Sequence, residues 1–218
     1  MEGPDAPLVL VTGFGPYPKV RVNPTATLAR AVAGSPRLRR LGLSARAHVF
    51  ETSYAAAGAQ APGVIAAAAP VACLHLGLAP RERMLRVETR GENRTRALSP
   101  DVRGNRPALR ALRPGSPAAL RSAAPLGAIL AALRRAGLKA RLSNDAGAYL
   151  CNAMYFWSLD EARASGARRP VVFVHLPRPA PAPGTLPRRR RKTVRPTDAE
   201  LTAALVDIAI ALARAGRR

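Results

Sequence analysis

Short apolar runs alternate along the chain with longer stretches of helical pattern. Continuous apolar runs of about four to eight residues are typical of strands that are buried on both faces of a sheet. They predict strands at residues 7–12, 45–51, 71–76, 85–89, 139–142 and 171–175. The longer stretches predict helices at residues 25–33, 54–69, 117–136, 150–164 and from 197 onwards. This alternation predicts one α/β domain over residues 1–218, with a mostly parallel sheet covered on both faces.

Local signals place several helix ends. Asn23 followed by Pro24 is a favourable N-cap and first helical residue. Thr197 and Glu200 have the spacing of a capping box at the start of the last helix. That helix then carries one apolar stripe, which consists of Leu201, Leu205, Ile208 and Leu212. The pair Pro62-Gly63 predicts a break in the helix at residues 54–69.

Two segments do not follow the alternation. Residues 90–116 are rich in Arg, Gly, Asn and Pro, and they predict a long irregular excursion. Residues 177–195 predict a loop rich in Pro and Arg that contains the basic run 188–192. Long loops in a compact domain are usually either functional or disordered, and residues 90–113 are the part expected to meet a substrate or a partner subunit.

Ligand sites of open α/β sheets form in loops at the carboxyl ends of the strands. Four segments are predicted to meet there, and they span residues 13–18, 77–83, 143–151 and 175–177. These segments are expected to carry the functional side chains.

The charge of the chain first suggests an anionic partner. The net charge is +22, from 35 Lys and Arg against 13 Asp and Glu, and charge of this size is typical of nucleic-acid binding. The run 188–192, however, has no interleaved aromatic residues, and no recognised binding motif accompanies it. A codon bias towards arginine would produce the same composition, so the sequence argues against nucleic acid as the partner.

Composition also bears on the compartment and on cofactors. No stretch reaches the roughly 18 apolar residues of a membrane span, and the first residues lack the basic region of a signal peptide. Two cysteines make no disulfide framework, so reduced thiols in a cytoplasm are expected. Cys73 and His75 are too few ligands for a zinc site, and Pro18 breaks a dinucleotide-binding glycine pattern. The sequence therefore predicts no metal and no cofactor.

Cys151 is the first candidate for chemistry. It lies where a short predicted strand gives way to a predicted helix. A thiol at a helix N-terminus is exposed to the positive end of the helix dipole and to free amide groups, both of which stabilise a thiolate. The alternative is a buried cysteine that packs as a small apolar side chain. From this context alone, both interpretations stand.

His175 is the corresponding candidate for a general base. It ends the predicted strand 171–175, where it can take a proton from a thiol and return it to a leaving amine. The alternative is a strand-end histidine that serves only structure. A carboxylate on the second ring nitrogen would complete a Cys–His–acid triad. The spacing of the residues does not choose among the candidate acids, which are Glu82, Glu88 and Glu92.

The combined motifs resemble those of pyroglutamyl peptidase I, also called pyrrolidone-carboxylate peptidase, a family of cysteine peptidases. The segment SNDAGAYLCN at residues 143–152 is similar to the family's cysteine motif, and VVFVHLP at 171–177 is similar to its histidine strand. The opening VTGFGPYPKVRVNPT at 11–25 and the segment HLGLAPRERMLRVETRGEN at 75–93 are similar to two further motifs. The resemblance spans almost the whole chain and is that of a divergent bacterial member.

The resemblance implies a fold, an activity and a set of roles. The fold is a single-domain three-layer α/β/α sandwich around a twisted, mostly parallel sheet, in a cytosolic and often homotetrameric enzyme. The activity is removal of an N-terminal pyroglutamyl residue from a small peptide with a blocked N-terminus. Cys151 is then the nucleophile and His175 the proton carrier, and Glu88, eleven residues after Gly77, orients His175. The amide of Cys151 helps to stabilise the oxyanion. The residues that would hold the lactam ring are Phe14, Tyr17, Leu78, Tyr149 and Leu150.

Several positions depart from the family pattern. Leu78 replaces a glutamine, and the pair Pro80-Arg81 replaces two glycines. Leu98 stands where the family has an arginine near the oxyanion, so Arg96 or Arg103 is the candidate to replace it. Loss of a polar partner changes discrimination between substrates. An acyl group other than pyroglutamyl is therefore one alternative, and a catalytically retired polyanion-binding protein is another.

Overall fold

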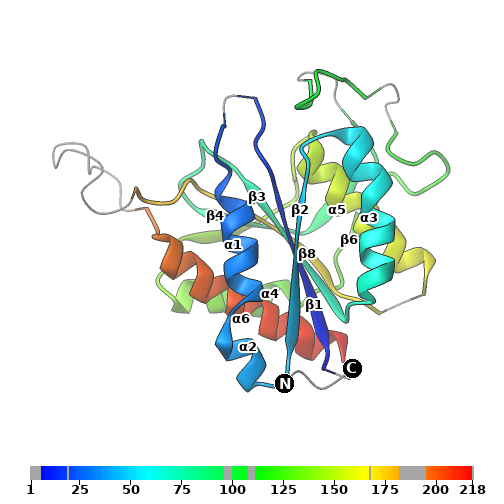
Figure 1. The fold of residues 1–218 in the computed structure, drawn as a ribbon. Helices are drawn as coiled ribbons and strands as arrows, with labels where there is room; N and C mark the ends of the chain where they lie inside the picture. The colour runs from blue at the N-terminus through cyan, green and yellow to red at the C-terminus, as the bar shows by residue number, and fades with distance from the viewer. Residues whose placement is uncertain are drawn as a thin grey trace.

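Six strands form the central sheet of the computed structural model, which describes residues 6–18, 20–95, 100–107, 111–166, 168–181 and 195–217. Their order across the sheet is β2-β1-β3-β8-β4-β7 (Figure 1). Their bounds are Ser44–Phe50 for β2, Leu8–Phe14 for β1, Ala72–Leu78 for β3, Val171–Leu176 for β8, Leu85–Glu88 for β4 and Ala140–Ser143 for β7. The sheet confirms the α/β class and the strand predicted at every one of these positions.

The sheet is mixed and mostly parallel. Strands β2, β1, β3 and β8 run in one direction, whereas β4 pairs antiparallel with β8 and β7 pairs parallel with β4. Strand β8, the last strand of this sheet in chain order, therefore lies between β3 and β4. Every residue of β3 and β8 is buried, as expected for strands with near-continuous apolar sequences.

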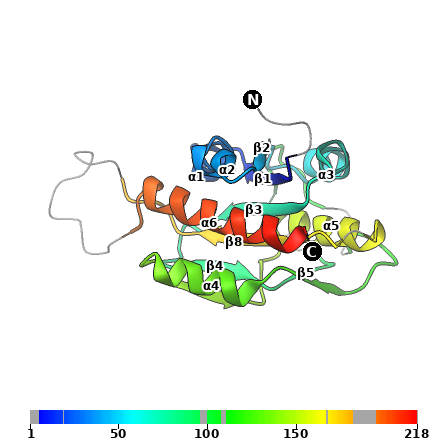
Figure 2. The same cartoon turned by 90° about the horizontal axis from the view of Figure 1, so that it is seen from below.

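Helices cover both faces of this sheet and make three layers, which Figure 2 shows edge on. One face carries α1, α2, α4 and α6, with bounds Pro24–Ala33, Pro36–Arg40, Leu126–Arg135 and Asp198–Gly216. The other face carries α3 and α5, with bounds Tyr54–Ala68 and Leu150–Ala164. A two-stranded sheet of β5 (Arg90–Glu92) and β6 (Ala119–Arg121) packs beside α5.

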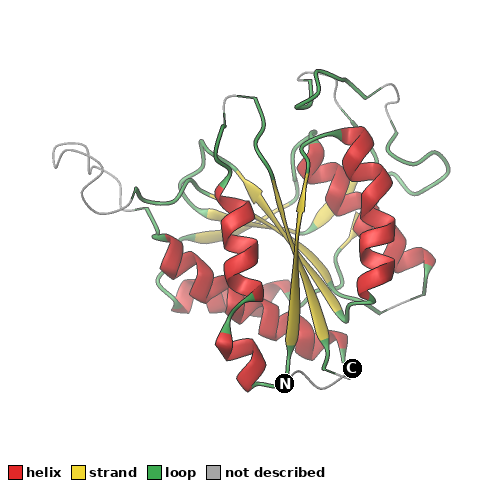
Figure 3. Cartoon of the chain, viewed as in Figure 1, coloured by secondary structure: helices red, strands yellow, loops and turns green. Residues whose placement is uncertain are grey.

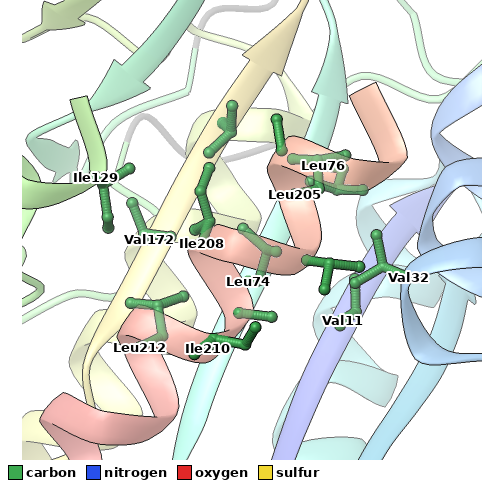
Figure 4. Packing of buried hydrophobic residues seen from close by; sticks show 14 of the residues in the cluster. Val11, Val32, Leu74, Leu76, Ile129, Val172, Leu205, Ile208, Ile210 and Leu212 are labelled. Carbon is green, nitrogen blue, oxygen red and sulfur yellow. The ribbon is translucent and has the colours of Figure 1, made fainter. Parts of the chain in front are cut away.

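The larger apolar core lies between the sheet and α6 (Figure 4). Alternate residues of the inner strands, such as Leu74, Leu76 and Val172, point into it. The predicted stripe on α6 is fully buried at all four positions, which are Leu201, Leu205, Ile208 and Leu212. The predicted caps also form, since Asn23 caps α1 and Thr197 forms a capping box with Glu200. The remaining strand residues face α3 and α5, which is the face that carries the candidate site.

The predicted break at Pro62 was wrong, because α3 is continuous from Tyr54 to Ala68. Pro62 and Gly63 lie on the exposed side of the helix, where water can serve the carbonyl that loses its partner. The opposite side buries Ala57, Ala61 and Ile65 against the sheet and α5. Packing of this buried side outweighs the local cost of the proline.

Two further expectations were wrong, and one helix was missed. The helix predicted at residues 117–136 begins only at Leu126, since Ala119–Arg121 pairs instead with Arg90–Glu92. The same pairing shows that the irregular excursion begins with a strand. Helix α2 was missed, although Ser35 followed by Pro36 repeats the cap signal of α1. Pairing between segments distant in sequence leaves no local pattern.

The loops gather at the upper end of the view in Figure 3. Within the predicted excursion, buried Asp101 accepts hydrogen bonds from the backbone amides of Tyr54, Arg103 and Asn105. Residues 100–107 are thereby tied to the start of α3. The basic run 188–192, together with the polyanion function that it suggested, lies outside the described residues.

Candidate active site

All four predicted segments contribute to one cavity of about 250 Å³. Its lining residues are Phe14, Tyr17, Asn23, Thr52, Leu78, Ala79, Arg86, Ala146, Gly147, Tyr149, Leu150, Cys151 and His175. One expectation was wrong, because β7 runs opposite to β8 and residues 144–149 therefore do not leave the sheet from the same edge. They reach the cavity as the connection into α5.

Cys151 is the second residue of α5 and is a free, partly buried cysteine. The backbone amides of the first turn of an α-helix have no partner within the helix, and they lie at the positive end of its dipole. Gly77 leaves room for the thiol, since a Cβ built on Gly77 would lie 3.0 Å from the Sγ atom of Cys151. The N-terminus of α5 thus presents the thiol to the cavity rather than to the core.

His175 is held from behind by Glu88. The Nδ1 atom of His175 lies 2.8 Å from the Oε1 atom of Glu88, and both residues are buried. An Nδ1–H group that donates to this carboxylate leaves Nε2 for the side-chain hydrogen bond with Cys151. Glu88 can reach the ring because β4 lies beside β8, where Glu88 is opposite Phe173, two residues before His175. The three side chains therefore form a connected set of thiol, imidazole and carboxylate.

The structure separates the three candidate acids. Glu82 contacts Arg86 and Arg141. Glu92 pairs with two other arginines, and its backbone amide donates to the side chain of Asn152. Of the three, Glu88 is the carboxylate that contacts His175.

The surroundings favour a charged imidazole. Burial of His175 opposes the charged ring, but attraction to Cys151 and the hydrogen bonds with Cys151 and Glu88 outweigh it. Together they raise the pKa of His175 to about 9. A histidine that keeps its proton at neutral pH is suited to a thiolate–imidazolium pair and to protonation of a leaving amine.

Aromatic and aliphatic side chains form the walls beside the thiol. Phe14 comes from the end of β1 and Tyr17 from the connection after it, Leu78 from the end of β3, and Tyr149 and Leu150 from the start of α5. All five residues predicted to contact a substrate therefore line the cavity. Burial and the nearby Cys151 raise the pKa of Tyr17, and burial and Asp101 raise that of Tyr149 to about 12. Both phenols are consequently neutral near pH 7.

Hydrogen bonds fix these walls. Asn23 and Thr52 both donate to the backbone carbonyl of Gly15, which holds the connection after β1. The hydroxyl of Tyr149 donates to the carbonyl of Pro100, and its ring meets that of Tyr54 edge to face. The supporting contacts therefore come from Asn23, from Thr52 and Tyr54, and from Pro100.

The structure describes only some of the groups that were predicted to stabilise the oxyanion. The amide of Cys151 lies in the first turn of α5, as the prediction requires. Arg96 lies outside the described residues, as does Leu98. Arg103 pairs with Glu51 and does not line the cavity. The structure therefore gives no support to Arg103 as an oxyanion donor.

Two residues at the candidate site were missed in the sequence analysis. Arg86 lines the cavity and contacts His175, but its position opposite His175 depends on the antiparallel pairing of β4 and β8. Asn152 is buried beside Cys151, and it exchanges hydrogen bonds with the backbone of Glu92. The adjacency of Asn152 to Cys151 in the motif was the signal that could have found it.

His75 and the second cysteine, Cys73, lie outside the cavity. His75 is buried and bonded to the hydroxyl of Thr12, and burial lowers its pKa to about 3. Burial raises the pKa of Cys73 to about 12, so this thiol stays protonated. Within the described ranges, no three His, Cys, Asp or Glu side chains gather as a metal site. In the same ranges, no helix is long and apolar enough to cross a membrane.

Gly77 gives a direct test of the cavity geometry. A Cβ on Gly77 would lie 2.6 Å from the ring of Phe173 and 3.0 Å from Cys151 Sγ. Gly77→Ala is therefore expected to lower the alkylation rate of Cys151 at least roughly tenfold and the unfolding free energy by about 1–3 kcal/mol. Iodoacetamide kinetics and thermal unfolding measure both quantities. Gly127→Ala is the control, because nothing lies within 4 Å of its Cβ, and an equal effect in both variants would refute the geometry.

Known proteins with this sequence pattern share the fold. A family model described as pyroglutamyl peptidase matches residues 8–213. The pyrrolidone-carboxylate peptidase of Pseudomonas fluorescens is 32% identical over 170 residues, which is 78% of this chain and 78% of that protein. The protein of the same name from Pyrococcus furiosus is 30% identical over 169 residues, which is 78% of this chain and 80% of that protein.

Solved structures agree with this match. A point mutant of the pyrrolidone carboxyl peptidase from Pyrococcus furiosus superposes with a TM-score of 0.82 at 27% identity, covering 95% of this chain and 98% of that one. Pyroglutamyl peptidase I of Bacillus amyloliquefaciens gives a TM-score of 0.82 at 23% identity, covering 95% and 97%, and supports the fold.

Proposed function

Because the chain belongs to the pyroglutamyl peptidase family, whose model matches residues 8–213, we propose that it removes N-terminal pyroglutamyl groups from peptides. It is a cysteine peptidase by family, and Cys151, His175 and Glu88 are its proposed triad. The single observation that carries the assignment of roles is the contact of His175 with Glu88 at the wall of the cavity that holds Cys151. The size of the cavity, about 250 Å³, suits a small cyclic acyl group.

The proposed reaction uses the thiol as nucleophile. The Cys151 thiolate attacks the pyroglutamyl carbonyl carbon, a C–S bond forms, and the carbonyl oxygen becomes an oxyanion that the Cys151 amide stabilises. Collapse of this intermediate breaks the C–N bond, and His175 gives its proton to the departing amine. His175 then takes a proton from water, whose oxygen attacks the thioester. The C–S bond breaks, pyroglutamate leaves, and the Cys151 thiolate is regenerated beside the protonated His175.

The walls support recognition of a flat, mostly apolar ring. Phe14, Tyr17 and Tyr149 present aromatic surface, and Leu78 presents a side chain that cannot hydrogen-bond to a lactam. Leu78 is the observation that favours the second candidate, a related cysteine-dependent amide hydrolase whose acyl group is less polar than pyroglutamyl. Both candidates share the chemistry at Cys151.

A substrate panel tests the proposal. The wild-type enzyme is expected to release a fluorogenic amine from the pyroglutamyl amide faster than from the prolyl, cyclopentanecarbonyl and acetyl amides. The measurement is kcat/KM for each amide. Faster turnover of the cyclopentanecarbonyl amide would support the second candidate. Failure to turn over any of the four would reject both.

Two further properties belong to the proposal. A nucleophilic thiol must stay reduced, and both cysteines are free, so we place the enzyme in the cytoplasm. The resemblance to the family suggests a homo-oligomer, a tetramer, and this subunit number stays a prediction.

A further inference from the structure

Arg86, on β4, contacts both the carboxylate of Glu88 and the imidazole of His175. It lies opposite His175 in the antiparallel pairing of β4 and β8. Its Nε atom is 3.2 Å from Glu88 Oε1, an ion-pair contact in which Nε makes no hydrogen bond to the described residues, and its Nη2 atom is 3.3 Å from His175 Nδ1. Its Nη1 atom is 3.2 Å from Glu82 Oε1. One guanidinium therefore joins Glu82, Glu88 and His175.

These contacts are not equivalent. The Nδ1 atom of His175 has one proton to give, and its shorter contact is with Glu88 at 2.8 Å. The guanidinium has only donors, so it cannot accept that proton. It instead places a permanent positive charge next to the imidazole ring. The second carboxylate oxygen of Glu88, Oε2, has no hydrogen-bond partner among the described residues. Arg86 is consequently the charge that compensates a fully buried carboxylate.

Few other charges face this pair. Within the described residues, the phenols near this pair are Tyr17, Tyr54, Tyr149 and Tyr155, and they are neutral near pH 7 because burial raises the pKa of each. Arg141 on β7 contacts Glu82 rather than the pair itself. His75 on β3 is also neutral, and Arg178 after β8 is exposed to water. The side chain of Arg86 is only 18% exposed, so its charge is less screened than that of a surface arginine.

We propose, on the basis of the proposed function, that Arg86 is a positioning residue that orients Glu88 and sets the pH range in which Cys151 and His175 hold their reactive charges. Its positive charge favours loss of a proton from the pair. Its ion pair with Glu88 Oε1 and its contact with His175 Nδ1 keep the carboxylate beside the imidazole. The alternative is a structural ion pair that stabilises β4 and leaves the ionisation unchanged.

The test follows the reactive thiol directly. The rate of Cys151 alkylation by iodoacetamide is measured from pH 4 to 11 in the full-length protein, with the labelled site identified by mass spectrometry. Arg86→Met is expected to move the inflections of this profile upward by about one pH unit, because removal of a nearby positive charge increases proton affinity. Arg86→Lys keeps the charge, so its profile is expected to stay near the wild-type profile. Arg46→Met, which removes an exposed arginine from β2, is the control.

A second measurement separates charge from geometry. With an amide substrate that the wild-type enzyme hydrolyses, Arg86→Met is expected to lower kcat about tenfold or more with little change in KM. Arg86→Lys is expected to recover part of that loss. Should Arg86→Met fail to fold, Arg86→Gln, which also lacks the charge but keeps a donor for Glu88, decides between the two interpretations.

The outcomes are distinct. An Arg86→Met or Arg86→Gln profile that coincides with wild type, or that moves downward, overturns the proposal. The alkylation profile needs no substrate, so it decides the role of Arg86 even if no pyroglutamyl amide is hydrolysed, which would instead reject the proposed function.

Discussion

Cys151→Ala is expected to lower kcat/KM on any amide that the wild-type enzyme hydrolyses by about 10⁴-fold or more. The reason is that the variant lacks the atom that would bond to the acyl carbon, while the amide of residue 151 and the cavity walls remain. The thiol is partly exposed at a helix N-terminus, so its removal creates no large void in the core. Unchanged thermal unfolding together with lost turnover would assign the loss to chemistry.

The second cysteine supplies the control for this experiment. Cys73 is also on the face of the sheet that packs against α3 and α5, but it is fully buried, and burial raises its pKa to about 12. Cys73→Ala is expected to keep wild-type turnover and to lose about 1–2 kcal/mol of stability by leaving a small cavity. Mass spectrometry after iodoacetamide treatment should find the label on Cys151. A Cys151→Ala enzyme with more than a tenth of wild-type activity would contradict the proposed nucleophile.

Glu88→Gln is expected to lower kcat roughly 10²- to 10⁴-fold and to narrow the pH range of activity from the basic side. Glutamine keeps the size of the side chain but removes the negative charge that helps to hold the proton on His175. Burial opposes the charged ring, and the contacts with Cys151 and Glu88 raise the pKa of His175 to about 9. Without the carboxylate charge the pKa of His175 falls, so the imidazolium is lost at a lower pH.

A pH–rate profile measures this effect. In the wild-type enzyme, kcat is expected to decline as the pH rises through about 9, whereas in Glu88→Gln the decline begins at lower pH. Glu161→Gln is the matched control, because Glu161 also pairs with an arginine, Arg169, but lies in the later part of α5 outside the cavity. A Glu88→Gln profile that differs from wild type only in height would contradict an electrostatic role for Glu88.

The sequence predicted those parts of the fold that depend on local patterns. Apolar runs located all six strands of the central sheet. The capping residues Asn23 and Thr197 located the starts of α1 and α6. Cys151 and His175 were identified as candidates because their settings, a helix N-terminus and a strand end, are themselves local. The resemblance to a family then supplied an order and a spacing for the motifs.

Features that depend on pairing between distant segments were not predictable from the residues. From the residues alone Glu88 was one of three possible acids, and only the family resemblance selected it; the antiparallel pairing of β4 with β8 is what places it beside His175. The same pairing brings Arg86 to the ring, and no local pattern marks it. Strand β6 has three residues and no periodicity, so its pairing with β5 could not compete with the helical pattern around it.

The place of β8 in the sheet has a consequence for the newly made chain. Strands β2, β1 and β3 form one part of the sheet and β4 and β7 form another, and β8 is the strand that joins them. His175, which lies on β8, is 87 residues from Glu88 in the sequence. During synthesis the thiol of Cys151 therefore emerges before its proposed base, and that base has no carboxylate partner until the last strand inserts. The proposed peptidase would thus remain inert on the ribosome and become active only when its sheet is complete.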